Sequence, residues 1–265
     1  MQSLKSHELR YHSNMKKRLP RPFFCVSCMR PSYGKYSNAP REAFNCFFCN
    51  ATSRERSVIL GVMKTKKFYR KRAKRFVGIS DGAHTEKSLT KKYGQNYKNF
   101  LYHMEPNLDI TRVPLSLHST ADLITCSEVL EHVEPPIATA FLGLYLLLKP
   151  GGTLILSVPH TPKGTAHQEH FPILKESQLL LQSIPTLQGV DENEDMRFFQ
   201  NLVFHGGIGS TLEYRIFSED SLRQFLDNAG FVSIKAIGDS RFFGVTWEPW
   251  SRVWTARKPN LREVN

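Results

Sequence analysis

Residues 122–133 read DLITCSEVLEHV and residues 148–159 read LKPGGTLILSVP, and these two stretches decide the fold. Each contains an apolar, β-rich run of the kind found in a central strand. Between them, apolar residues recur at helical spacing, and Lys-Pro-Gly-Gly at 149–152 ends that helix. A strand, a helix and a second strand in this order predict a parallel sheet wrapped by helices.

The same alternation extends outward from these stretches on both sides. We predict strands at 75–80, 99–104, 121–126, 153–159, 231–237 and 252–257, with a short third element near Asp109 and Ile110. Helices are predicted at 85–93, before Leu148, and from Ser218 to Ala229. The expected fold class is therefore α/β, with a seven-stranded sheet.

The pair LEHV and LKPGG at this spacing resembles the fourth and fifth strands of the class I S-adenosylmethionine-dependent methyltransferases, and the resemblance covers roughly residues 75–258. It implies a Rossmann-like methyltransferase sheet with the cofactor across the carboxyl ends of the first, second and fourth strands. The implied reaction is methyl transfer to a hydroxyl or amine of a small-molecule or glycan acceptor. Two alternatives stay open: an RNA methyltransferase, or a non-catalytic binding protein with a degraded cofactor site.

The first motif departs from the family's pattern of an acid followed by two glycines. Gly78 stands where an acid is common, Ser80 replaces the first glycine, and Gly82 matches the second. Asp81 offers a carboxylate nearby. Small residues here let the backbone approach a cofactor closely. We therefore expect this turn to lie against the methionine and ribose portions of S-adenosylmethionine.

Further cofactor residues follow from the resemblance. Glu105 matches the second-strand acid that would hold the ribose hydroxyls, and Asp109 resembles the acid beside the adenine. The full set of implied cofactor contacts is Gly78, Ser80, Asp81, Gly82, Glu105, Asp109, Ser127 and Glu128. Glu131 and His132 are interpreted as structural residues that fix the start of the following helix.

A long insertion, residues 160–217, separates the fifth strand from the next helix, and such insertions often build the substrate pocket. It carries four histidines, the candidate general bases His160, His167, His170 and His205. Their spacing matches no strong metal template, so a metal bound by them is the less favoured interpretation. The sequence of residues 204–222 resembles sequences of methyltransferases of this class that are found among bacterial genes for surface polysaccharides.

Four of the five cysteines form two C-x2-C pairs, Cys25 with Cys28 and Cys46 with Cys49. Two such pairs complete a tetrahedral shell of four thiolates, which suits a structural zinc ion without an open position. Two disulfides are the alternative, but nothing in the sequence indicates an oxidising compartment. The sequence therefore predicts a small zinc-ribbon-like module.

Charge divides the chain near residue 75. Residues 1–75 hold 19 Lys and Arg against three acids, a net +16, whereas the remainder carries a net −4. A basic segment of this kind suggests a polyanion partner, which could be nucleic acid, an anionic glycan or a membrane surface, and the equal alternative is a solvated surface of Lys and Arg. The N-terminus lacks the apolar core of a secretory signal, and no stretch is long enough to span a bilayer, so we expect a cytoplasmic protein.

These observations predict the following division of the chain. It has a basic tail at 1–22, a zinc module at 23–52, a basic linker helix at 53–75, a methyltransferase domain at 76–258 and a tail at 259–265.

Overall fold

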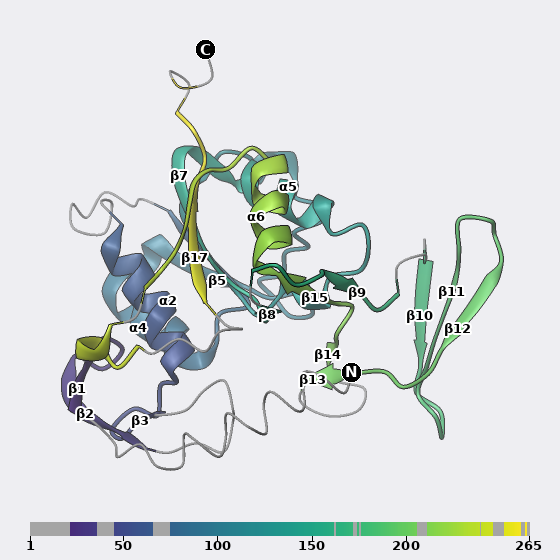
Figure 1. Ribbon diagram of the computed structural model, residues 1–265. Helices are drawn as coiled ribbons and strands as arrows, with labels where there is room; N and C mark the ends of the chain where they lie inside the picture. The colour runs from purple at the N-terminus through teal and green to yellow at the C-terminus, as the bar shows by residue number, and fades with distance from the viewer. Residues whose placement is uncertain are drawn as a thin grey trace.

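The computed structural model describes residues 22–35, 45–65, 75–161, 163–171, 174, 176–205, 211–238, 240–245, 252–260 and 263. A twisted central sheet lies between two layers of helices (Figure 1). A small cysteine-bearing sheet lies at one side, and the strands of the insertion extend on the other.

The central sheet has six strands, in the order β16-β17-β7-β6-β4-β5. Their bounds are β4 Phe76–Ile79, β5 Tyr97–Phe100, β6 Ala121–Ser127, β7 Leu148–Ser157, β16 Val232–Ala236 and β17 Val253–Arg257. β5, β4, β6 and β7 run parallel, and β17 pairs antiparallel with both β7 and β16. Three parallel strands therefore end at one edge, where Ile79 pairs with both Phe100 and Cys126.

The prediction of seven strands was wrong by one element. The segment around Asp109 and Ile110, expected as a third strand, forms a turn. Asp109 Oδ1 accepts hydrogen bonds from the backbone N and the Oγ1 of Thr111, at 2.8 and 2.7 Å. This local bonding favours a turn over a strand.

The helices cover both faces of the sheet. α2 (Ser53–Lys64) and α4 (Ala83–Tyr93) lie on one face, and α5 (Ala138–Leu147) and α6 (Glu219–Asn228) lie on the other (Figure 1). Side chains alternate along β6: Leu123 packs into the core under α2, whereas Ile124 packs into the core with α5. This period of two explains why the central strands are apolar throughout.

α2 is the helix predicted within the basic linker, and it packs on the sheet as part of the domain core. Thr52 and Glu55 form a capping box that fixes its start. Val58 and Val62 are buried beside Phe76 of β4. The predicted linker helix extended to residue 75, whereas α2 ends at Lys64; residues 66–74 lie outside the described part of the chain.

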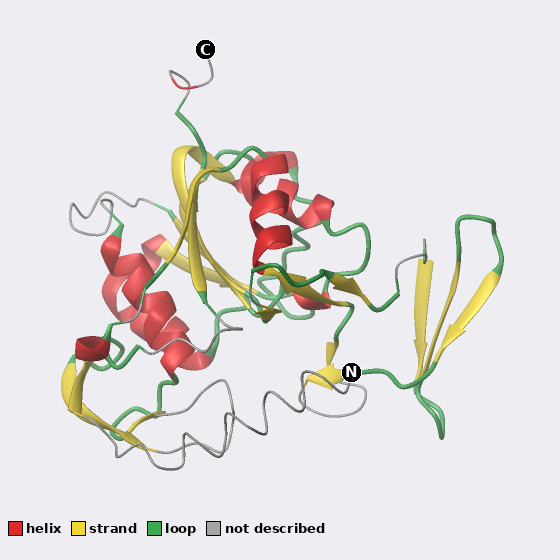
Figure 2. Ribbon diagram, in the orientation of Figure 1, coloured by secondary structure: helices red, strands yellow, loops and turns green. Residues whose placement is uncertain are grey.

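The cysteine module is an antiparallel sheet of β1 (Pro22–Cys25), β2 (Arg30–Lys35) and β3 (Asn45–Cys46). The described part of the insertion consists of short strands and loops (Figure 2). Its strands are β8 His160–Thr161, β9 Gln168–Glu169, β10 Glu176–Leu180, β11 Thr186–Val190, β12 Met196–Phe199, β13 Phe204–His205, β14 Thr211–Leu212 and β15 Arg215–Ser218. Short 3-10 turns occur at η1 Gly94–Asn96, η2 Leu115–Leu117, η3 Leu130–His132 and η4 Arg241–Phe243. Within the described ranges, none of the helices has the length and apolar character needed to cross a membrane.

Candidate active site and metal centre

The turn after β4 contains the residues predicted to approach the cofactor. Ser80 has a φ of 52°, in the left-handed region that glycine adopts without steric cost. Its backbone N donates to the carbonyl of Phe100, 2.8 Å away. Gly82 is the exposed N-cap of α4, so the turn leads directly into a helix N-terminus. This arrangement leaves backbone N–H groups at the sheet edge.

Asp81 points inward from this turn, and only 5% of it is exposed. Its Oδ2 accepts hydrogen bonds from the Tyr97 hydroxyl at 2.8 Å and from the Thr125 hydroxyl. Asn99 holds the Asp81 backbone on both sides, with its Oδ1 3.0 Å from the N and its Nδ2 3.1 Å from the O. Burial raises the pKa of Asp81 to about 6, although the two hydroxyls oppose the shift. We call the edge of the sheet at the carboxyl ends of the parallel strands the rim. Asp81 stabilises the turn from inside the sheet and does not face a cofactor at the rim, contrary to what the resemblance had implied.

The carboxyl ends of β6 and β7 form the next part of the rim. The Ser127 Oγ lies 2.8 Å from the Ser157 Oγ, and Ser157 donates to Glu128 Oε1 at 3.3 Å. Arg54 of α2 donates to the Ser127 Oγ from 3.0 Å. Arg54 was not predicted as a site residue, because it lies 73 positions from Ser127 and the sequence gives no sign that the two are in contact. The first turn of α2 is thus part of the rim.

The loop after β5 carries the remaining predicted cofactor acids. Glu105 is exposed, and its Oε2 accepts from the backbone N of Asn107 at 3.3 Å. A hollow of about 530 Å³ lies in the loop after β5, and Asp109, but not Glu105, is among its lining residues. Its lining residues are Tyr102, His103, Asn107, Leu108, Asp109, Arg112 and Pro114. This volume lies within the ~300–1,000 Å³ common for small-molecule sites.

His160 is the most deeply buried of the four predicted bases. Its ring is 1% exposed, and Nδ1 lies 3.1 Å from the carbonyl of Thr161. Its Nε2 accepts from the Arg252 backbone N at 3.2 Å and faces Trp254 Nε1 at 3.5 Å. Burial lowers the pKa of His160, which keeps the ring neutral. With both nitrogens engaged, His160 joins β8 to β17 and offers no nitrogen to an acceptor.

The other three histidines each pair with a carboxylate of the insertion. His167 Nε2 lies 3.0 Å from Glu169 Oε1. Glu213 binds two imidazoles, with Oε1 3.0 Å from His170 Nε2 and Oε2 2.8 Å from His205 Nε2. Burial opposes its ionisation, yet these bonds hold the pKa of Glu213 at about 2. The structure therefore brings His170 and His205 together and places His167 apart from them.

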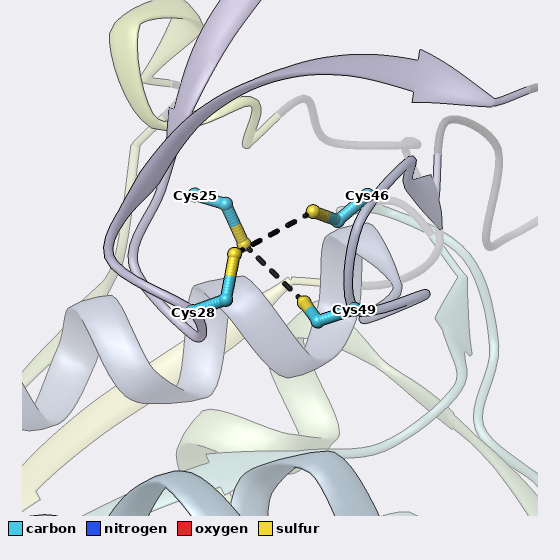
Figure 3. A group of neighbouring side chains, drawn as sticks. All are labelled: Cys25, Cys28, Cys46 and Cys49. Carbon is cyan, nitrogen blue, oxygen red and sulfur yellow. Dashed lines mark hydrogen bonds between the residues drawn. The ribbon is translucent and has the colours of Figure 1, made fainter.

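The four cysteines of the N-terminal module point toward one another (Figure 3). The Sγ–Sγ distances are 3.7 Å for Cys25 and Cys49 and 3.8 Å for Cys28 and Cys46, too long for disulfides. A tetrahedral zinc ion with Zn–S bonds of ~2.3 Å requires thiolates ~3.8 Å apart. The cysteine residues therefore fit the ion that their spacing predicted.

Ser32 and Arg56 favour negatively charged sulfur at this cluster, whereas burial raises the pKa values of the Cys25 and Cys28 thiols. The Ser32 hydroxyl lies 3.1 Å from Cys46 Sγ. Burial alone would raise the pKa of Cys46, but Ser32 and nearby backbone N–H groups lower it to about 6. The Arg56 guanidinium is fully buried beside the cluster, where it lies 4.5 Å over the Phe23 ring and donates to the carbonyl of Gly244 at 2.6 Å. A buried cation here offsets the negative charge that four thiolates leave on a zinc ion.

Comparison with known proteins identifies the family. A family model described as a methyltransferase domain matches residues 68–236, well over half of the chain. The chain belongs to this methyltransferase-domain family. The match includes the turn after β4, the rim at β6 and β7, and the described insertion. No curated protein matches the sequence.

Three solved structures illustrate how distant the similar methyltransferases are. The 1,6-didemethyltoxoflavin-N1-methyltransferase of Burkholderia thailandensis is 15% identical, with a TM-score of 0.37, over 73% of this chain and 64% of its own. DesVI of Streptomyces venezuelae is 10% identical, with a TM-score of 0.45, and the match covers 77% of this chain and 91% of DesVI. An S-adenosylmethionine-dependent methyltransferase of Clostridium acetobutylicum is 12% identical, with a TM-score of 0.43, over 78% and 91%. This methyltransferase domain thus spans slightly less than two thirds of the Burkholderia enzyme.

Nothing in the described residues supports the predicted contact with nucleic acid. Of the basic segment 1–75, the structure describes residues 22–35, 45–65 and Arg75. Within these ranges Arg56 is buried and Arg54 binds Ser127, so both side chains serve the fold or the rim.

Proposed function

We propose that this methyltransferase uses S-adenosylmethionine to methylate a hydroxyl or amine of a small-molecule or glycan acceptor. The proposal is carried by one observation: the tight turn at Ser80–Gly82, the hollow beside Asp109 and the polar end of β6 lie along the same edge of the sheet. Open α/β sheets bind their ligands outside the carboxyl ends of the strands.

Two parts of the chain would bind the two halves of the cofactor. The hollow after β5 would take the adenosine, with Glu105 and Asp109 as acceptors for ribose hydroxyl or adenine amine hydrogens. The turn at Ser80 and the N-terminus of α4 would lie against the methionine portion. When bound, S-adenosylmethionine supplies a methyl group on a sulfonium, so the protein needs mainly to align the acceptor.

Proton removal would fall to His170, because His167 is bonded at both nitrogens, to Glu169 Oε1 at 3.0 Å and to the Ser221 Oγ at 3.3 Å. An alcohol is a poor nucleophile at neutral pH, and an imidazole paired with a carboxylate can take its proton. Glu213 supplies that carboxylate, with its Oε1 3.0 Å from His170 Nε2. His160 is not proposed as a base because its ring is buried and bonded at both nitrogens.

We also propose that Cys25, Cys28, Cys46 and Cys49 hold one structural zinc ion, in support of the rim. Helix α2 begins four residues after Cys49, and its Arg54 side chain donates a hydrogen bond to the Ser127 Oγ. A zinc ion that fixes the two cysteine turns would therefore also fix the start of α2. Four sulfur ligands leave no open position, so the role is structural.

Calorimetric titration with S-adenosylhomocysteine tests the cofactor site without knowledge of the acceptor. We expect one binding site per chain and at least tenfold weaker binding in Asp109→Ala. The matched control is Asp227→Ala, since Asp227 is an exposed residue of helix α6 and is not among the residues that line the hollow. Absence of binding at hundreds of micromolar ligand would overturn the enzyme proposal and favour a non-catalytic role.

A further inference from the structure

A second cluster of metal-binding side chains lies where the chain after β6 meets the insertion. Glu131, His132 and His205 each offer a donor atom, and these atoms all lie within 4.8 Å of one another. His132 Nε2 is 3.6 Å from Glu131 Oε1, and the two imidazole rings meet edge to face at 4.7 Å. Ligands of one ion with bonds of ~2.1 Å lie ~3.0–3.5 Å apart, close to the observed 3.6 Å.

Bonds to neighbouring groups orient both imidazoles for this role. His132 Nδ1 lies 2.8 Å from the carbonyl of Leu212, which can only accept, so Nδ1 carries the hydrogen and Nε2 presents its lone pair. His205 Nε2 lies 2.8 Å from Glu213 Oε2, so this carboxylate fixes the orientation of the His205 ring. Metal-binding histidines are held in the same way, by a carbonyl or carboxylate at the other nitrogen.

The carboxylate ligand is fixed by its surroundings. Glu131 is fully buried, and its backbone carbonyl accepts from the N of Tyr214 at 2.8 Å. Arg215 donates to the carbonyls of Leu130 and Val133 on either side. The loop that carries Glu131 is therefore tied to β14 and β15 at several points. An ion held between the two histidines would place a positive charge beside this buried carboxylate.

We propose that Glu131, His132 and His205 bind one divalent transition-metal ion, with Glu213 as the residue that positions His205. Two imidazoles and one carboxylate suit manganese, iron, cobalt or zinc, and they differ from the thiolate set of the N-terminal module. Three protein ligands leave coordination positions open to a small molecule. This site is distinct from the zinc-binding cysteines in both ligand type and place.

The consequence for the reaction rests on the proposed function. Glu131 follows Glu128 of the rim by three residues, so an ion bound here would lie near the carboxyl end of β6. An acceptor oxygen bound to the ion would lose its proton more readily. The acceptor class favoured by this site is therefore a hydroxyl compound rather than an amine.

Manganese(II) is the probe of choice, because thiolates of the cysteine module select softer metals. The full chain, purified with its zinc, is titrated with manganese while the free-ion signal is followed by electron paramagnetic resonance. We expect one ion bound per chain, and at least a hundredfold loss of affinity in His205→Ala. Glu213→Gln should weaken binding by about ten- to a hundredfold.

His118→Ala is the control, since His118 bonds the carbonyl of Val113 through a similar imidazole contact away from this cluster. It should keep the affinity of the wild type. Circular dichroism of each variant reports folding; if His205→Ala does not fold, Glu213→Gln decides the question. No manganese binding by the wild type, or equal affinity in Glu213→Gln, would overturn the proposal. Titration with S-adenosylhomocysteine on the same samples separates the two proposals: manganese binding without cofactor binding would leave the metal site and remove the methyltransferase function.

Discussion

The carboxylate of Asp81 lies directly over Gly78. A Cβ atom placed on Gly78 would come within 2.5 Å of Asp81 Oδ2 and within 2.6 Å of the Tyr97 hydroxyl. The acid that the resemblance led us to expect at position 78 is therefore replaced in space by the carboxylate of Asp81, three residues later. Glycine is required at position 78 because the Asp81 side chain folds back into the sheet and occupies the space of a Cβ atom.

Gly78→Ala should lower the free energy of unfolding by about 1–3 kcal/mol, since the added methyl group must displace buried polar atoms. Urea denaturation measures the change. Gly238→Ala is the matched control, because no atom lies within 4 Å of a Cβ placed there. Equal stability of the two variants would contradict the packing described around Asp81.

Asp81 should make stability depend on pH. Its pKa is about 6 in the folded chain and ~3.9 in an unfolded one, so the folded state holds the proton more tightly. The cost of ionising it is absent below about pH 4 and complete above about pH 7, near 3 kcal/mol. Urea midpoints from pH 4 to 7.5 should fall for the wild type relative to Asp81→Asn. A gap that stays constant over this range would show that the carboxylate does not titrate as described; Asp227→Asn should follow the wild type.

Ser80 should tolerate glycine and reject a β-branched residue. At a φ of 52°, Ser80→Gly relieves strain, and we expect a gain of about 0.5–1 kcal/mol with unchanged affinity for S-adenosylhomocysteine. Ser80→Val should lose both stability and affinity. Ser119→Gly, at a φ of 51° away from the rim, should show the same gain in stability. Loss of stability in Ser80→Gly would mean that the hydroxyl, and not the backbone, determines this turn.

Zinc should be present at one ion per chain by elemental mass spectrometry. Cys49→Ser should lose the ion and lower the melting temperature, because α2 starts beside this turn. Cys126→Ala should keep the ion, since Cys126 is buried in the sheet core among apolar side chains. Zinc retained at full occupancy in Cys49→Ser would exclude a four-sulfur site.

Most strands and helix ends could be predicted because the pattern that indicates each of them lies within a few neighbouring residues. The apolar runs ending at Cys126 and Pro159 lie in or beside β6 and β7, and Gly230 follows α6 as expected. The strand predicted near Asp109 is a turn in the structure. The local sequence pattern does not indicate the hydrogen bond from the Thr111 backbone N to Asp109 that stabilises this turn.

Side-chain direction at the rim was the harder problem. Asp81 turns inward because Tyr97 and Thr125 reach it from two other strands. Glu131 and His132 were interpreted as residues that fix a helix start, since His205 approaches them only through the folding of the insertion. Contacts between residues tens of positions apart depend on the assembled sheet, and a single sequence does not contain them.

Glu105 provides the sharpest test of the adenosine site. Its side chain is exposed and bonds only locally in the described structure, to the backbone N of Asn107, so Glu105→Ala should leave the melting temperature unchanged. If its carboxylate accepts ribose hydroxyls, removal costs a charged hydrogen bond, and affinity for S-adenosylhomocysteine should fall at least tenfold. Calorimetry measures this, with Glu176→Ala on the exposed edge of β10 as the control. Full affinity in Glu105→Ala would move the ribose away from the end of β5 and leave Asp109 as the acid of that site.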